Sequence, residues 1–501
     1  MEQKLLSVTA KEKNGLTTGV DGIQETPSIK EVLKNKAFMV LFGAQFIENI
    51  GRAISGLALE FLVWDLTGSP FMMGILAIIW LLPFVLITPI AGVYTDRFDQ
   101  RKIMLWSNIL SALASIGYVI VYLFQNSFLV LISYNGFVQY STRYMLLALF
   151  ILCFLNSSSA AFFFPARSAY TRLIVKKKNL LIANSIGSTV FQIATIVGFV
   201  IAGVFAAISY SLSFIFDATT FVVSGMLILL IFKVGMKPPE VVREKSKTIK
   251  QEFRSFYDDM KVGFRVIREQ PKISYMLIIF SGLMFAFGAI NVLFIVILRG
   301  EMNLSSTWYG ALQGLMGATG IITAIILMSF GKLKRKILLM NLGFLGATIG
   351  MYIFAVSRNA WVIAAVLGTY GILSVMINVP ASTLIQEMVP YEKQGRVFGF
   401  QQLAQGVAQL VGMGIVSLIA EYVLPMYVLL ASSGILTIVI VGGFIYSARK
   451  GLMIDDYADS EANGKKKPLS LDEMDVQKDL EITADVSLTE VSKPIKAKNL
   501  D

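Results

Sequence analysis

The sequence contains no histidine and a single cysteine, and only 15% of its 501 residues are charged. Without histidine, imidazole cannot serve as a metal ligand, a general base or a proton relay. The one cysteine, Cys153, lies inside an apolar run, so no disulfide framework forms. A soluble domain carries about 25% charged residues, and this chain is short of the side chains that keep a surface hydrated. Soluble enzymes, DNA-binding proteins and secreted disulfide scaffolds are therefore excluded as classes.

Long apolar runs are what the sequence does contain, because 55% of its residues are hydrophobic. A run of about 20 apolar residues spans a bilayer as a helix. The sequence predicts twelve such helices, and hence an all-α membrane protein, at residues 37–63, 71–95, 103–124, 144–164, 181–207, 211–234, 273–298, 307–330, 336–356, 360–380, 396–420 and 425–447.

The loops between these runs differ in basic residues. If the N-terminus is inside, the inner loops contain 24 Lys and Arg residues and the outer loops contain 3, namely Arg143, Arg299 and Arg358. Basic residues concentrate in cytoplasmic loops. We therefore expect a multi-pass protein of the plasma membrane with both termini in the cytoplasm. The net charge of +11 then reflects the anionic inner leaflet, and no nucleic-acid partner is expected.

The order of the runs predicts two bundles of six helices related by pseudo-symmetry. Pro165-Ala166 follows the fourth run and Pro380-Ala381 the tenth, so we expect these prolines to close equivalent spans. A same-direction repeat is typical of transporters whose site lies between two halves. The predicted domains are a cytoplasmic N-terminal segment (1–36), an N-terminal bundle (37–234), a cytoplasmic linker (235–272), a C-terminal bundle (273–448) and a disordered cytoplasmic tail (449–501).

Apolar residues recur every three or four positions within the linker, at Ile249, Phe253, Phe256, Met260, Phe264 and Ile267. This pattern indicates an amphipathic helix that lies against the inner membrane surface. A weakly ordered linker is the alternative.

The loop between the second and third runs carries a recognisable motif. It contains Gly92, Asp96, Arg97, Arg101 and Lys102 in the pattern G-x-x-x-D-R-x-x-x-R-K, which resembles the loop signature of the major facilitator superfamily. The stretches Thr67-Gly68-Ser69, Phe164-Pro165-Ala166 and Phe216-Asp217-Ala218 are similar to the branch that holds macrolide-efflux proteins and the enterobactin exporter. The resemblance covers residues 36–448 and implies a transporter that works by alternating access.

The same resemblance implies a gate at the cytoplasmic end. Asp96 would face the start of the eleventh span, at Gly395 and Arg396, when that side is closed. A carboxylate is stabilised at a helix N-terminus, so the contact would favour the outward-facing state. The alternative is a short charged turn that only fixes the topology. One departure concerns the fifth span, where Phe199 stands in place of the proline of the antiporter motif, which weakens the argument for export from that motif.

The first span holds the main candidates for a binding or coupling site. Gln45, Glu48 and Arg52 share one helix face with Asn49, and Glu48 and Arg52 are spaced to pair. We interpret this strip as lining a cavity that binds a polar part of the substrate or accepts a proton. The alternative is a self-neutralised pair that locks the first helix to a neighbour.

Asp217 lies within the sixth run, with no basic residue in that run before Lys233. A carboxyl group without a cationic partner in apolar surroundings favours its protonated form, which suits a proton carrier. A structural hydrogen bond explains Asp217 equally well. By resemblance, Gln405 and Gln409 of the eleventh span face the central cavity.

These patterns predict a secondary transporter, not an enzyme, with no cofactor or metal and with a monomeric state. We expect proton-coupled efflux of an amphipathic compound, such as a macrolide-like drug or a siderophore. The 22 methionines and 12% aromatic residues suit an adaptable apolar cavity. The alternatives are an importer or lysophospholipid flippase of the same fold, and a non-transporting receptor or scaffold.

Overall fold

A computed structural model describes residues 28–133, 138–234, 249–329 and 335–452. Within these ranges the side chains of residues 96, 125–142, 249–256, 391 and 392 are not described. The described residues form helices and no strand. The predicted tail (449–501) lies almost wholly outside the described residues, as does most of the N-terminal segment.

The first half of the chain begins with a short helix and continues with long ones. Its elements are α2 (Ile29–Lys34), α3 (Lys36–Thr67), α4 (Pro70–Leu86), α5 (Thr88–Arg97), α6 (Gln100–Ser133), α7 (Val138–Ile174), the 3₁₀ turn η1 (Lys177–Asn179), α8 (Leu180–Ile208) and α9 (Tyr210–Val234).

The second half begins after the helix α10 of the predicted linker and contains a short π-helix. Its elements are α10 (Ile249–Glu269), α11 (Pro271–Ile295), the π-helix η2 (Val296–Glu301), α12 (Ser306–Ser329), α13 (Lys336–Val356), α14 (Ala360–Met388), α15 (Tyr391–Ile419) and α16 (Pro425–Arg449).

Among the described residues, eleven helical stretches are long and apolar enough to cross a membrane. Three are composite: α4 with α5, η1 with α8, and α11 with η2. The helix α3, which holds the predicted first span, is not among the eleven. Its 32 residues are more than enough to cross a membrane, but Glu48 and Arg52 lower its hydropathy. The chain is therefore the all-α, multi-pass membrane protein that the apolar runs predict.

The prediction that proline closes the fourth and tenth spans is wrong. Pro165 lies inside α7 and Pro380 inside α14, and the helices continue to Ile174 and Met388. Proline removes one backbone hydrogen bond, but neighbouring helices and hydroxyl side chains can compensate in a packed membrane helix. Both halves thus place a proline at an equivalent point of an equivalent helix.

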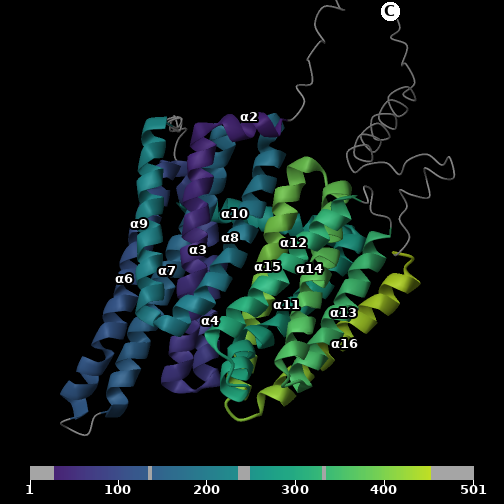
Figure 1. The fold of residues 1–501 in the computed structure, drawn as a ribbon. Coiled ribbons are helices and arrows are strands. Elements are labelled where there is room, and N and C mark those ends of the chain that lie inside the picture. Colours follow the sequence, from purple (N-terminus) through teal and green to yellow (C-terminus); the bar gives the residue numbers. More distant parts are fainter. Residues whose placement is uncertain (1–27, 134–137, 235–248, 330–334, 453–501) are drawn as a thin grey trace, which may run out of the picture.

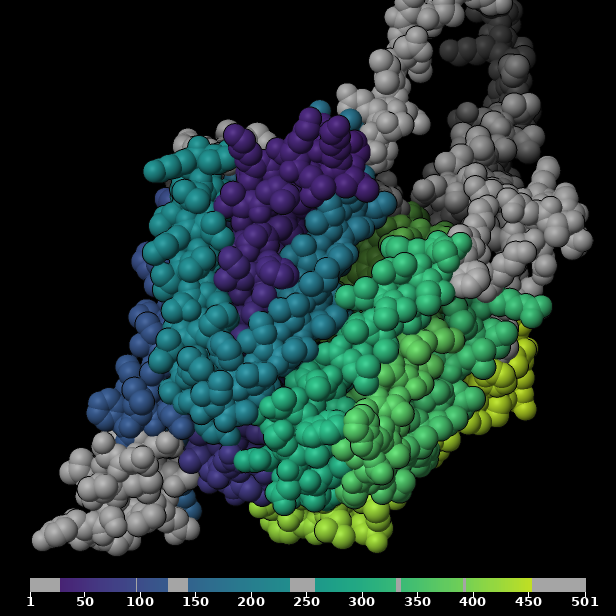
Figure 2. All heavy atoms as spheres, viewed as in Figure 1, coloured from purple at the N-terminus to yellow at the C-terminus, as the bar shows by residue number. Residues whose placement is uncertain are grey.

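The helices gather into two bodies that lie side by side (Figure 1). We call the end of the molecule that carries α2 the α2 face, and the opposite end, where α3 ends and α4 begins, the loop face. The space-filling view shows α8 of the first half in broad contact with α12 of the second half toward the loop face (Figure 2).

The linker helix α10 packs on α15. The ring of Phe264 lies 5.5 Å from that of Phe400, and Gly263 packs directly against the backbone of Arg396. One side of the amphipathic helix therefore covers α15. The predicted contact of α10 with the membrane surface stays a prediction.

Candidate functional site

A cluster of charged side chains is buried inside the first half. Arg52 donates to a carboxylate oxygen of Glu48 at 2.6 Å, in the i, i+4 geometry that the spacing predicts. Glu48 is 2% exposed and Asp217 of α9 is 0% exposed. Charges at this depth are costly unless they pair or line a cavity, so the cluster requires the partners described next.

The partners come from three helices. Arg52 donates to Asn156 of α7 at 3.2 Å, and its guanidinium lies 5.1 Å from the ring centre of Phe221 on α9. The Asp217 carboxylate accepts a hydrogen bond from Ser115 of α6 at 2.7 Å. Glu48 is thus held by a cation, whereas the hydrogen bond of Asp217 comes from a neutral hydroxyl.

Gly51 explains why α3 and α9 approach closely enough to build this cluster. A Cβ atom at Gly51 would collide with the side chain of Thr220 and lie 2.8 Å from Oδ1 of Asp217. A larger residue would push the two helices apart. The glycine at position 51 therefore allows α3 and α9 to meet beside the buried acids.

Several polar atoms of the cluster have no hydrogen-bond partner among the described residues. They are Nε2 and Oε1 of Gln45, Oε2 of Glu48, Nε of Arg52 and Oδ1 of Asp217. Buried polar groups normally have hydrogen-bond partners. These atoms are therefore available to bind a proton, a water molecule or a polar ligand. Arg167 of α7 also acts electrostatically on Glu48.

The two predicted glutamines of α15 lie apart from this cluster. Gln405 and Gln409 are half-buried in the second half, where the backbone at Gln409 packs against Gly288 of α11. Nε2 of Gln405 is buried and has no partner among the described residues. The structure brings Gln45, Glu48, Arg52 and Asp217 together, and it does not join Gln405 and Gln409 to them.

The loop signature lies at the α2 face. The side chain of Asp96 lies outside the described residues, so its predicted contact with α15 stays a prediction. Gly92 is in α5, Arg97 is half-buried and Lys102 is exposed. Arg396, at the start of α15, pairs with Asp259 of α10 at 2.8 Å.

Arg101 of the same signature has a structural role within the first half. It is 5% exposed, pairs with Asp99 at 2.8 Å, and lies 4.5 Å from the ring centre of Phe232. Burial disfavours the charge of Asp99, but the hydrogen bonds from Arg101 outweigh this cost and hold the pKa of Asp99 below its usual value. Arg101 therefore fastens the start of α6 to α9.

Hydrogen bonds and ion pairs between described residues of the two halves gather at the loop face. Asp65, at the end of α3, pairs with Arg299 of η2 at 3.3 Å and accepts a hydrogen bond from Tyr210 at 2.6 Å. Glu421 accepts hydrogen bonds from the hydroxyl of Ser69 at 2.8 Å and from the backbone at the start of α4 at 3.3 Å. A carboxylate of the second half thus caps a helix of the first. We call these two contacts, with the α8–α12 contact below, the loop-face latch.

Glycines bring α8 and α12 into backbone contact in the same region. The hydroxyl of Ser306 donates to the carbonyl oxygen of Gly203 at 2.9 Å. A Cβ atom at Gly203 would lie 2.6 Å from the Ser306 carbonyl oxygen, and one at Gly310 would collide with the Phe199 carbonyl oxygen. Gly203 lies four residues after Phe199 and ends the antiporter motif of the fifth span, so the altered motif retains the glycine that allows this contact.

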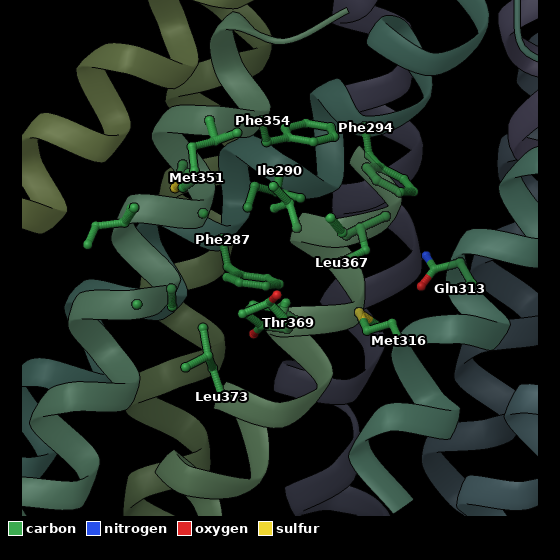
Figure 3. A pocket seen from close by; sticks show the side chains of 18 of the residues that line it. Phe287, Ile290, Phe294, Gln313, Met316, Met351, Phe354, Leu367, Thr369 and Leu373 are labelled. Carbon is green, nitrogen blue, oxygen red and sulfur yellow. The ribbon is translucent and has the colours of Figure 1, made fainter. Parts of the chain in front are cut away.

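The second half contains a cavity of about 480 Å³ between α11, α12, α13 and α14. Its walls are mainly aliphatic and aromatic. Figure 3 shows Phe287, Ile290 and Leu367 around the space, with Gln313 and Met316 approaching from one side. Most binding cavities have this composition, with a few polar groups that orient the ligand.

One corner of the cavity is polar and includes a residue of the other half. Glu60 of α3 accepts a hydrogen bond from the hydroxyl of Tyr309 at 3.1 Å, and Gln313 donates to that same hydroxyl at 3.5 Å. Glu60 is the one charged residue among the described residues that line the cavity. The first half therefore contributes a carboxylate to a cavity that the second half builds.

The patterns in the sequence did not indicate roles for Glu60, Asp65 and Glu421. Glu60 and Asp65 stand on the same helix as Glu48, but their partners are 249 and 234 positions away in the chain. Beyond Lys36 at its start, α3 contains four charged residues (Glu48, Arg52, Glu60 and Asp65) in an apolar helix, and this number was a signal that more than one site uses α3.

Comparisons with known proteins agree with this geometry. The sequence profile described as Major Facilitator Superfamily matches residues 41–413. Macrolide efflux protein A of Streptococcus pyogenes is 23% identical over 416 residues, which cover 82% of this chain and 96% of that protein. Enterobactin exporter EntS of Escherichia coli is 23% identical over 393 residues, covering 75% of this chain and 85% of that protein.

Solved structures show the same fold. A bacterial homologue of the iron transporter ferroportin in an inward-facing state has a TM-score of 0.63 at 17% identity, covering 81% of this chain and 98% of that one. The structure described as the outward-facing state has a TM-score of 0.51 with the same coverage.

Proposed function

Because the chain belongs to the Major Facilitator Superfamily, we propose that it is a plasma-membrane transporter that exports an amphipathic compound in exchange for protons. It works by alternating access, so that its interior opens to one side of the membrane at a time. The efflux and exporter proteins among its relatives support the direction of transport. The substrates named for these relatives guide only the choice of test compound.

In this proposal the α2 face is cytoplasmic. The excess of basic residues in the loops at that end supports the orientation. The loop-face latch then closes the external side, so the structure represents an inward-facing state. The higher TM-score with the inward-facing ferroportin homologue supports the same state.

The cavity of the second half is the observation that carries the choice of substrate class. Its volume of about 480 Å³ and its apolar, aromatic walls suit a compound with a large apolar body. The polar corner at Tyr309 and Gln313 would orient a polar group of that compound. Methionine in the wall, as at Met316, lets the surface adapt to different shapes.

We assign proton transport to the buried cluster of the first half, and Asp217 in particular is the proposed proton-carrying group. Glu48 has a direct cationic partner in Arg52, whereas Asp217 has a hydroxyl donor and one unpaired oxygen. In apolar surroundings a carboxyl group gains or loses its proton according to whether water and opposite charge reach it. Opening and closing of the halves would change that access during each cycle.

The test uses inverted membrane vesicles that hold a preformed pH gradient, acidic inside. Addition of the macrolide erythromycin should dissipate the gradient when the wild-type protein is present. Asp217→Asn should lower this response at least about tenfold, the size of effect expected when an essential proton-carrying group is removed. It should retain exchange of labelled for unlabelled erythromycin, which needs no net proton movement.

Glu301→Gln is a matched control, since Glu301 pairs with Arg358 at 2.6 Å within the second half and should leave the response unchanged. Import, lipid flipping or a receptor role would replace the proposal if a panel of amphipathic compounds bound the protein without moving protons. Undiminished proton movement in Asp217→Asn would remove Asp217 from the mechanism.

A further inference from the structure

We propose that the cavity of the second half selects lipophilic ammonium compounds, and that Glu60 is their counter-ion, supplied by the first half and withdrawn when the loop face opens. This inference rests on the proposed function and names its substrate class.

Among the described residues that line the cavity, Glu60 is the one charged residue, and none is Lys or Arg. Its Oε2 atom accepts the hydrogen bond of Tyr309, and the other oxygen has no hydrogen bond to a described residue. Repulsion would exclude an anionic ligand from this corner. A cationic ligand would neutralise a carboxylate that otherwise stands alone in apolar surroundings.

The rings around Glu60 suit an ammonium group as well. Tyr309, which donates to Glu60, lies edge-on to Phe294 of the cavity wall at 5.0 Å between ring centres. Aromatic faces attract cations, and clusters of such rings bind alkylammonium groups in other proteins. The remaining apolar wall, including Phe287 and its neighbour Tyr370 at 5.1 Å, would receive the apolar body.

The location of Glu60 couples this site to the conformation. Glu60 belongs to α3, one turn before Trp64, which packs against Gly300 of the second half at the loop face. When the halves separate there, α3 and its carboxylate move away from α11 and α12. The cavity would then lose its counter-ion, its affinity for the cation would fall, and the compound would leave on the side that has just opened.

The experiment measures equilibrium binding to the purified full-length protein in nanodiscs. The probes are a radiolabelled benzyl-dodecyl-dimethylammonium ion and its neutral carbon analogue, in which a quaternary carbon replaces the nitrogen. The ammonium stays charged at every pH, so ionisation of the probe does not enter. The wild-type protein should bind the cation about tenfold or more tightly than the neutral probe, as expected for a charge-assisted contact in a partly buried site.

Glu60→Gln should abolish this preference by weakening the cation about tenfold while leaving the neutral probe within about twofold. Glu60→Asp, which keeps the carboxylate, should still bind the cation more tightly than the neutral probe, and it serves as the second variant if Glu60→Gln does not fold. Glu301→Gln removes a carboxylate outside the cavity and should change neither affinity. Equal binding of both probes to the wild type, or a preference that survives Glu60→Gln, would overturn the assignment.

The coupling between the position of Glu60 and the opening of the loop face has its own test. Gly310→Val places side-chain atoms where α12 meets the backbone of α8, which should hold the loop face apart and weaken the cation selectively. Unchanged binding of the cation in this variant would show that Glu60 does not leave the cavity when the loop face opens. Proton-coupled export of erythromycin by Glu60→Gln, with the cation preference intact, would retain the proposed function and remove only this inference.

Discussion

The interiors of the two halves differ more than their shared helix order suggests. The first half buries Glu48 and Asp217, with the half-buried Arg52 beside them, among hydroxyl and amide groups. The second half lines a largely apolar cavity, and Glu60 of the first half lies at its polar corner. The same six-helix plan thus supports a packed, charged core in one copy and a hollow, apolar core in the other, and the proposals divide protons and substrate accordingly.

The first prediction concerns the charged core. Arg52→Met removes the cation that pairs with Glu48 and leaves a buried, uncompensated carboxylate. The variant should lose about 3 kcal/mol of stability at neutral pH, measured by reversible unfolding in detergent micelles. The double variant with Glu48→Gln should recover most of the loss. Equal stability of the single and double variants would show that the ion pair does not hold this core together.

A comparison of two phenylalanines sharpens the contrast between a packed and a hollow interior. Phe214 of the first half is fully buried, whereas Phe287 lines the cavity of the second. Phe214→Ala should cost about 3–5 kcal/mol, as for a well-packed core position. Phe287→Ala should cost about half as much, because one side of its ring already faces empty space, and should weaken binding of the neutral probe.

The third prediction concerns the contact that joins the halves. Gly310→Ala should destabilise the closed loop face by about 1–3 kcal/mol, because its methyl group would meet the backbone at Phe199. Fluorescence of Trp64, in a variant with the other tryptophans replaced, should shift toward that of a water-exposed ring. Gly414→Ala, which adds a methyl group in open space, is the control. No shift in the Gly310→Ala protein would mean that the interface yields without opening.

The smallest effect is expected at the edge of the first half. Hydrogen bonds from Lys176, Asn179 and Lys178 lower the pKa of Glu31 from 4.5 to about 2. Because the folded-state pKa is depressed, the contribution of Glu31 is fully present above pH 4.5 and declines as the pH falls toward 2. Hydrogen exchange of α2 should therefore increase, relative to Glu31→Gln under the same conditions, between about pH 6 and about pH 3. A constant ratio would show that the contact does not hold α2.

Local patterns in the sequence were enough to predict the helices and the strip on α3. Apolar run length determines a spanning helix, and the i, i+4 spacing of Glu48 and Arg52 places them within reach of each other. The ends of α7 and α14 were predicted too early, because proline is a weaker stop signal inside a packed bundle than in water.

Contacts between distant segments were beyond the reach of these patterns. Nothing near Glu60 in the sequence points to Tyr309, and nothing near Ser69 points to Glu421, because these partners are 249 and 352 positions apart and meet only when the two halves pack together. The cavity was also unpredictable, since its lining comes from six helices and its shape depends on where side chains fail to fill the space.

The burial of the one thiol in the chain has a practical consequence. Cys153 is 2% exposed and is the only cysteine, and a structural cysteine enclosed in apolar surroundings reacts slowly. A cysteine introduced at any exposed position would thus be the one group that maleimide reagents modify readily. Pairs of spin labels placed across the α2 face could be attached to the otherwise natural chain, and their separation would report directly on how far the two halves move apart.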